Sequence, residues 1–183
     1  MKATEILMEE HRVIERVLDA LEKAAQRLET GQMRPGFFVD AAEFIKGFAD
    51  GCHHKKEEGV LFVAMTAHGI PQQGGPIGVM LAEHEQGRAF TRGMREAAQK
   101  LEAGDGSARE AVLANARGYA GLLRQHIMKE DKILFPMADQ VIPPAGQEKV
   151  AEDFERVEKE ETGAGVHEKY LALAERLESE ANA

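Results

Sequence analysis

Cysteine, positive charge and long apolar runs are scarce in this sequence, and each shortage excludes some classes of protein. A single cysteine, Cys52, excludes an internal disulfide framework and suits a reducing compartment. The formal net charge of −9 argues against a nucleic-acid-binding protein, which needs a basic surface. No apolar run approaches the roughly 20 residues of a membrane-spanning helix, and the charged N-terminus does not resemble a signal peptide. We therefore expect a cytoplasmic protein with no nucleic-acid or membrane partner.

The residues that are abundant favour helices. Leucine, alanine, glutamate, lysine and arginine dominate the composition, whereas tryptophan is absent and only two tyrosines occur. A length of 183 residues is enough to bury the core of one domain. We expect an all-α protein.

Apolar residues that recur every three or four positions predict four long helices, at about residues 4–29, 37–67, 77–103 and 107–138. Thr4 is the predicted N-cap of the first helix. The connections between the helices are short enough to make neighbours antiparallel, which predicts an up-down-up-down four-helix bundle over residues 1–140. Two shorter helices, at about 147–161 and 166–180, are expected to form a C-terminal helical extension over residues 141–183, packed on the outside or one end of the bundle.

One pattern occurs twice in the predicted bundle, at an offset of 73 residues, the separation of His53 from His126. Each copy has an early histidine that follows a glutamate, and a later His-x-x-x-Glu that is followed by Leu-Phe. Residues four apart share one face of a helix, so each His-x-x-x-Glu directs an imidazole and a carboxylate toward the same point. The members of the pattern are His11, His53 and Glu57 in the first copy, and His84, His126 and Glu130 in the second.

All six residues occupy apolar seam positions of their helices, so helices in register bring them together inside the bundle. Four imidazoles and two carboxylates are costly to bury without a partner. Six nitrogen and oxygen ligands are too many for one structural zinc ion, but they suit two ions with two imidazoles each and two bridging carboxylates. A donor set without thiolate favours iron or manganese. The ferritin-like di-iron pattern fits less well, because it is carboxylate-rich and uses Glu-x-x-His.

The histidine and glutamate pattern, with the Leu-Phe that follows each motif, resembles the hemerythrin-like HHE cation-binding family over about residues 1–140. The resemblance implies a four-helix bundle with an oxo- or hydroxo-bridged centre of two non-haem iron ions. The ligand set His11, His53, Glu57, His84, His126 and Glu130 is most similar to that of the bacterial repair-of-iron-centres proteins.

One position departs from the oxygen-carrying hemerythrins, which have a second histidine where this chain has Arg88. The resemblance then implies an open coordination position on each iron, and reactivity with O2, NO or peroxide. Sensing, scavenging or iron-centre maintenance is the expected function. An iron store or donor, and a di-iron peroxidase or NO reductase enzyme, are the alternatives, and a protein partner stays open.

Several other side chains are candidates for contact with the metals. His54 aligns with Ile127 in the repeat, which predicts that it pairs with Glu58 beside the cluster. The alternative is that His54 and Glu58, instead of His53 and Glu57, form the ligand pair of this helix. His167, in the extension, either replaces the missing histidine or only packs against the bundle. Tyr119 lies on the inner face of its helix and either hydrogen-bonds a bound ligand or fills the core. Asp131 is an alternative carboxylate ligand to its neighbour in the chain, but the repeat favours Glu130.

Overall fold

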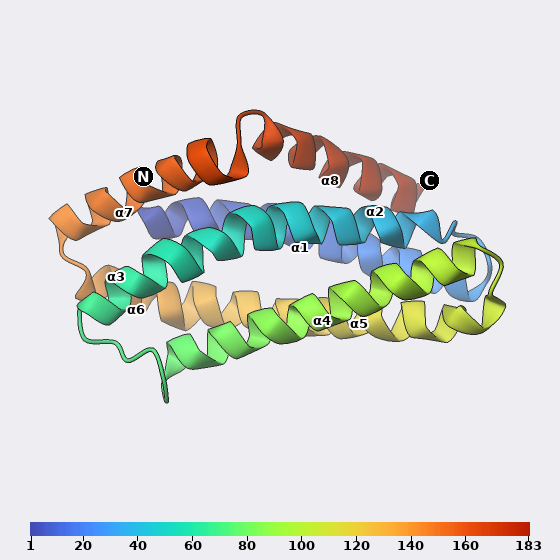
Figure 1. Cartoon of the computed structure of the whole chain (residues 1–183), viewed down its shortest axis with the longest axis horizontal. Helices are drawn as coiled ribbons and strands as arrows, with labels where there is room; N and C mark the ends of the chain where they lie inside the picture. Colours follow the sequence, from blue (N-terminus) through green and yellow to red (C-terminus); the bar gives the residue numbers. More distant parts are fainter.

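Helices make up the whole of the regular structure, as the sequence predicts (Figure 1). The computed structural model describes residues 1–183. None of its helices combines the length and the apolar character needed to cross a bilayer. The first two long helices consist of α1 (Ala3–Glu29), then α2 (Gly36–Phe44), η1 (Ile45–His54), η2 (Glu57–Leu61) and α3 (Phe62–Ala67). The next two consist of α4 (Pro76–Glu102), then η3 (Gly106–Ala108), α5 (Arg109–Lys129), η4 (Glu130–Leu134) and α6 (Phe135–Val141).

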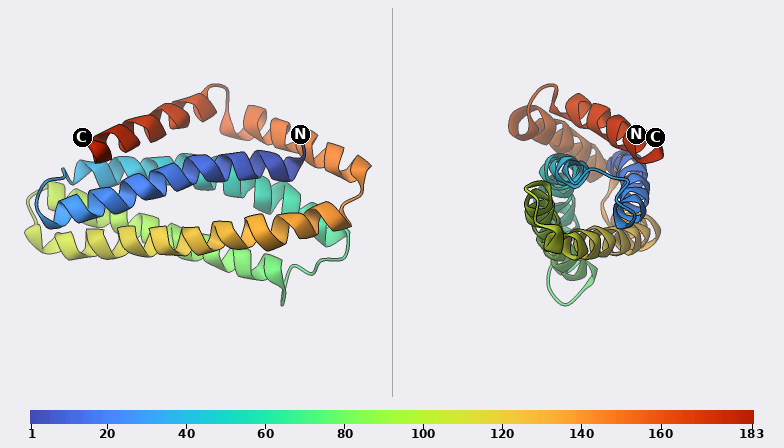
Figure 2. Two further views of the ribbon diagram at one scale, coloured as in Figure 1. Left: turned by 180° about the vertical axis from the view of Figure 1, so that it is seen from behind. Right: turned by 90° about the vertical axis from the view of Figure 1, so that its right-hand side faces the viewer.

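The four long helices run alternately up and down and enclose a shared interior, which the end-on view shows clearly (Figure 2). Helix α4 packs against α2 and α5, and α1 packs against α5. The up-down-up-down bundle is therefore confirmed. The short connections of the sequence explain this topology, because a short loop requires each helix to run antiparallel beside the one before it.

The interior of the bundle holds two apolar clusters rather than one. The first includes Ile14 and Met94, and the second includes Leu7 and Met80. In each cluster, the first of these two residues lies on α1 and the second on α4. Both helices therefore contribute to both clusters. His11 falls between the two clusters on α1, and His53, Glu57, His84 and Glu130 do the same on their own helices. A buried polar layer thus separates two halves of an apolar core.

The helices that carry this layer are not regular α-helices. The segments η1, η2 and η4 are π-helical. Hydrogen bonds in a π-helix span five residues instead of four, so each turn is wider, and such insertions are frequent at functional sites. The segment η1 ends at His54, η2 begins at Glu57 and η4 begins at Glu130, so these three segments coincide with the predicted site. A fourth π-helical segment, Val157–Thr162, lies in the C-terminal extension.

The start of the first helix differs from the prediction by two residues. Lys2, not Thr4, precedes the first helical residue, and Thr4 lies inside the first turn. The Thr4 hydroxyl donates a hydrogen bond to Asp139 over 2.9 Å instead of capping its own helix. The expected N-cap is wrong because a tertiary partner on α6 competes for the same hydroxyl.

The C-terminal extension forms an arch along one side of the bundle (Figures 1 and 2). It consists of α7 (Pro144–Arg156), η5 (Val157–Thr162) and α8 (Val166–Asn182). Gly163 and Gly165, at the top of the arch, have φ angles of 100° and 77°, which L side chains rarely adopt. Helix α8 packs against α1 and α2, so the extension covers a side of the bundle and not one end.

Gly47 lets α8 approach the bundle closely. A Cβ atom at this position would lie 1.8 Å from Cζ of Tyr170, whose hydroxyl donates to Glu43. Gly47→Ala is therefore expected to push α8 outward and to destabilise the protein by about 1–3 kcal/mol, as overpacking does. Amide hydrogen exchange is expected to become faster in residues 166–182 and to stay unchanged in α5. Gly121→Ala is the control, because no atom lies within 4 Å of its Cβ position. Equal exchange in α8 of both variants would contradict this account of the extension.

Candidate metal centre

The six predicted residues come together in the polar layer between the two apolar clusters. Each of them is at most 2% exposed. Together with His54, they form two groups in which the potential ligand atoms lie within 4.8 Å of one another. Glu57 belongs to both groups. The first contains His11, His53, Glu57 and Glu130, and the second contains His54, Glu57, His84 and His126.

Two carboxylates lie at the middle of the cluster, and each has one oxygen toward histidines of each group. Glu57 Oε1 is 3.3 Å from His53 Nε2, and Glu57 Oε2 is 3.3 Å from His84 Nε2. Glu130 repeats the arrangement, with Oε2 3.1 Å from His11 Nε2 and Oε1 3.1 Å from His126 Nε2. This is the geometry of carboxylates that can bridge two ions.

His54 is a fifth histidine of the cluster, and its predicted position beside the site is wrong. The side chain is 3% exposed, and its ring stacks on that of His84 with 3.8 Å between the centroids. Its Nδ1 lies 2.9 Å from Asp50 rather than near Glu58. Its Nε2 has no hydrogen-bond partner. His54 thus resembles the predicted ligands in burial and in orientation.

The π-helical segment η1 explains why two adjacent histidines reach the same cluster. On an α-helix, neighbouring residues point about 100° apart, so only one of His53 and His54 is expected to face the core. The wider turn of η1 brings both onto the inner face. The repeat concealed this, because Ile127 replaces the second histidine in the other copy. The one indication in the sequence was Asp50, which precedes His54 by four residues and so lies on the same face of the helix, within reach of its ring.

Every histidine of the cluster is oriented by a carboxylate at Nδ1. Such a contact places the ring proton on Nδ1, so that Nε2 of a neutral imidazole directs its lone pair into the cluster. This is the arrangement that metal-binding histidines adopt. The pairs are His11 with Asp131 at 2.7 Å, His53 with Glu10 at 2.9 Å, His54 with Asp50 at 2.9 Å, His84 with Glu58 at 2.7 Å, and His126 with Glu83 at 2.8 Å.

Four of these five outer carboxylates follow the same repeat as the inner residues, and Asp50 is the exception. Glu10 and Glu83 are the glutamates that precede the early histidine of each copy, and each holds the later histidine of its own copy. The ammonium of Lys56 contacts Glu10 and that of Lys129 contacts Glu83, again at equivalent positions. The two glutamates can be identified in the sequence, but only the fold shows which histidine ring each one contacts.

Several inward-facing atoms have no hydrogen-bond partner within the protein. They are Nε2 of His53 and His54, both oxygens of Glu57, and Oε1 of Glu130. In addition, Nε2 of His84 and Nε2 of His126 lie only 3.0 Å apart. Buried polar groups without partners destabilise a protein by about 1–3 kcal/mol each. Two imidazole nitrogens this close need a proton or a metal ion between them. The residues present therefore fit a metal centre.

Two histidines of the cluster, His53 and His84, bind protons strongly when no metal is present, as their pKa values show. Burial lowers the pKa of His53, but Glu57 and Glu10 together raise it to about 10. Burial likewise lowers the pKa of His84, while Glu57 and Glu58 raise it to about 9. Burial raises the pKa of Glu57, but His53 and His84 hold it well below its usual range. The cluster therefore attracts positive charge strongly, in the form of protons or of metal ions.

His167 does not join this cluster. It lies instead in a separate group with Glu10, Cys52 and Glu158. The Lys56 ammonium already supplies a cation there, 2.7 Å from Glu158 and in contact with Glu10. Burial raises the pKa of the Cys52 thiol to about 11, which disfavours the thiolate that a metal needs. The fifth histidine of the cluster thus comes from η1 and not from the extension.

Tyr119 and Arg88 also lie outside the two groups. Tyr119 is 1% exposed, belongs to the first apolar cluster, and its hydroxyl has no hydrogen-bond partner. Arg88 donates to Glu58 over 2.8 Å and lies 3.5 Å from Asp50. It therefore stabilises two of the carboxylates that orient the histidines, and does not take the place of a ligand.

Comparison with known proteins agrees with this site. The hemerythrin HHE cation-binding domain matches residues 2–138, and the chain therefore belongs to this family. Uncharacterized proteins of Mycobacterium bovis and Mycobacterium tuberculosis are 26% identical to it over 166 residues, which cover 88% of this chain. The chain spans 63% of the length of these curated relatives. No solved structure matches it.

Proposed function

We propose that this protein holds two non-haem iron ions at the buried cluster and that the centre reacts with O2, NO or peroxide. The unpartnered inward-facing atoms of the cluster carry the proposal. Imidazole and carboxylate donors without thiolate suit iron. When bound, reduced iron supplies the electrons and the vacant coordination position that such small ligands require. The proposed ligands are His11, His53, His54, Glu57, His84, His126 and Glu130.

The two groups of ligands are unequal, and this gives the proposed centre one reactive side. Three rings belong to the group of His84, whereas only His11 and His53 belong to the other. If both carboxylates bridge, the group of His11 and His53 offers one ligand fewer than the group of His84. The vacant position is therefore proposed on the side of His11 and His53. This revises the expectation of an open position on each ion, because His54 supplies the ligand that Arg88 does not.

The surroundings favour small, uncharged ligands. The phenylalanine of each Leu-Phe pair covers the cluster: the ring of Phe135 stacks on His11 at 5.4 Å, and that of Phe62 lies 6.1 Å from His84. These apolar rings and the apolar clusters on both sides exclude water from the site. The carboxylates that hold all five rings argue for ions that stay bound, so they support a reactive centre over an iron donor.

Stopped-flow spectroscopy of the iron-loaded protein tests this function. The protein is reduced without oxygen and then mixed with buffer that contains O2, NO or peroxide. A rapid change in absorption that saturates with ligand concentration is expected for at least one of them. The Glu57→Gln variant, mixed in the same way, provides the baseline. An iron-loaded protein whose spectrum changes no faster than this baseline with all three ligands would refute the proposed function.

His54 provides a test of the proposed ligand set. His54→Ala removes one ring from the three-ring group, and loss of a ligand is expected to weaken metal retention by at least about 10–100-fold. The expected result is a lower metal content after dialysis against a chelator, together with an altered spectrum. His167→Ala is the matched control and is expected to retain metal like the unmodified protein. If His54→Ala retains as much metal as this control, His54 is not a ligand.

A further inference from the structure

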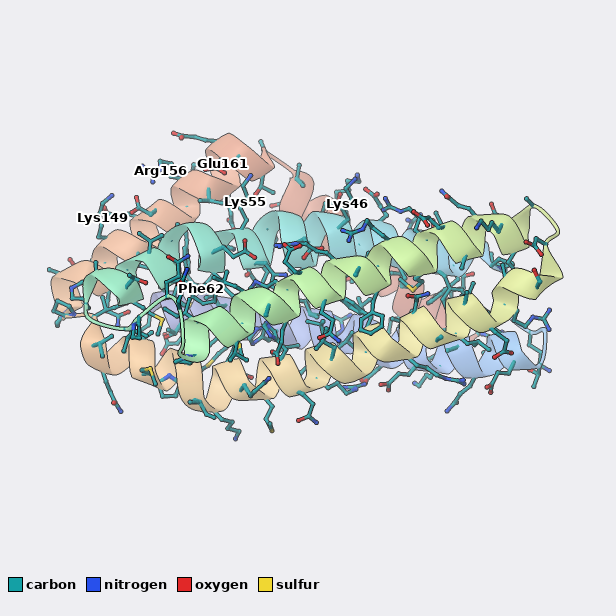
Figure 3. The ribbon with its side chains drawn as sticks, turned by 60° about the horizontal axis from the view of Figure 1, so that its bottom comes forward. Lys46, Lys55, Phe62, Lys149, Arg156 and Glu161 are labelled. Atoms are coloured by element: carbon teal, nitrogen blue, oxygen red, sulfur yellow. The ribbon has the colours of Figure 1, made fainter.

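A polar cavity of about 420 Å³ opens beside the metal centre, between η1 and α4. Figure 3 labels Lys46 on the helix next to α4. No apolar residue contributes to the lining. Four cations and one carboxylate line this cavity in a chain whose net charge is −9, so the local charge is reversed. The lining residues are Lys46, Asp50, Arg88, Thr91, Arg92 and Arg95.

The positions of the cations follow from helix geometry. Arg88, Arg92 and Arg95 are spaced by four and three residues, so they share one face of α4. Lys46 and Asp50 are spaced by four residues on η1 and face the arginines across the cavity. The two helices thus direct one lysine and three arginines toward the same space.

Most of this positive charge is not neutralised within the protein. Lys46 and Arg92 form no ion pair, and the Arg95 guanidinium lies 3.6 Å from Glu43, a distant contact. Only Arg88 is well paired, with Glu58 at 2.8 Å and with Glu85. Like charges that face one another repel, so three poorly paired cations around one cavity favour an anion between them.

We propose that this cavity binds the phosphate group of a small ligand. The guanidinium fork matches phosphate oxygens in pairs, and a lysine ammonium adds a point charge. Three cations that are free or only distantly paired suit the double negative charge of phosphate better than the single charge of a carboxylate. The volume of about 420 Å³ exceeds that of a phosphate group alone and leaves room for a small organic part.

This site goes beyond the proposed function and lies next to it in space. Arg88 lines the cavity and also donates a hydrogen bond to Glu58, and Asp50 lines the cavity and also contacts His54. Asp50 and Arg88 therefore connect the cavity to the residues of the metal centre. Its binding does not need the metals, so it can be measured on metal-free and on metal-loaded protein separately.

Isothermal titration of the full chain with inorganic phosphate, and with acetate for comparison, tests the proposal. Phosphate is expected to bind at one site, more tightly than acetate, and more weakly as salt is added. Lys46→Ala and Arg92→Ala are each expected to weaken phosphate binding about tenfold or more. Both side chains are exposed, so these variants are expected to keep their helix content. Lys100→Ala, an exposed cation on the same helix, is the matched control.

The outcomes separate this site from general charge attraction and from the metal centre. Equal weakening by Lys100→Ala and Arg92→Ala would overturn the proposal, as would the absence of saturable phosphate binding. Acetate that binds as tightly as phosphate would overturn the assignment of the ligand class. Phosphate binding that is lost together with the metals would place the anion at the metal centre instead. Weakening confined to Lys46→Ala and Arg92→Ala, with or without metal, would establish the cavity as the site.

Discussion

Glu57→Gln is expected to reduce the metal content from about two ions per chain to less than one. Glu57 has one oxygen toward His53 and the other toward His84, so its carboxylate is the only side chain that belongs to both groups of potential ligands. Glutamine keeps the size of the side chain but removes the negative charge and replaces one acceptor by a donor. In the proposed centre, both ions would therefore lose a ligand at once.

The measurement is metal analysis of the purified variant after dialysis against a chelator. Glu161→Gln is the matched control, because Glu161 is an exposed glutamate that pairs only with Lys55, at 2.9 Å (Figure 3). Circular dichroism is expected to show a helical protein in both variants. Metal content in Glu57→Gln equal to that of Glu161→Gln would show that Glu57 is not a shared ligand.

Removal of the metals is expected to lower the melting temperature by about 10–15 °C at pH 8. A ligand present at a thousand times its dissociation constant stabilises the folded state by about 4 kcal/mol. Each kcal/mol corresponds to about 2–4 °C in a chain of this length. The measurement is calorimetry of the metal-loaded and chelator-treated protein. Equal melting temperatures would mean that the cluster does not bind metal in the folded state.

The metal-free protein is also expected to lose stability as the pH rises. The pKa values of His53 and His84 rise from the usual 6.5 to about 10 and about 9 on folding. A raised pKa of this kind stabilises the folded state fully below about pH 6.5, and the contribution disappears as the pH passes the folded values. Glu57 has the opposite shift, so its contribution is lost on acidification.

A series of melting curves between pH 6 and 10 tests this pH dependence. The metal-free protein is expected to melt at progressively lower temperatures across this range. The metal-loaded protein is expected to change much less, because metal ions replace the protons whose loss causes the effect. Parallel curves for the two forms would contradict the idea that protons and metals compete for the same atoms.

The sequence predicted the bundle because its main determinants are local. Apolar periodicity and short connections set the helices and their antiparallel order, and these features do not depend on distant contacts. Six of the cluster residues were also predictable, because a His-x-x-x-Glu in an apolar seam is unfavourable without a partner and the pattern occurs twice. Thr4 shows the limit of such local rules, because its hydroxyl pairs with Asp139 on a helix far away in the chain.

His54 was not predictable from helical periodicity because it depends on a departure from the regular α-helix. A spacing rule based on 3.6 residues per turn excludes one of two adjacent residues from the core, and the π-helical turn of η1 removes that exclusion. The repeat gave no help, because Ile127 stands in the equivalent position. The contact between Glu10 and His53 was not predictable for another reason. The two residues lie on different helices, so their contact depends on how the bundle packs.

The metal content and the optical spectrum of the purified protein, reduced without oxygen and then exposed to air, test the central claim most directly. The proposed centre predicts about two iron ions per chain and absorption bands of a bridged ferric pair that appear on oxidation. A stably folded protein that contains zinc, or no metal, and shows no such bands would contradict the di-iron assignment and the reactivity proposed with it.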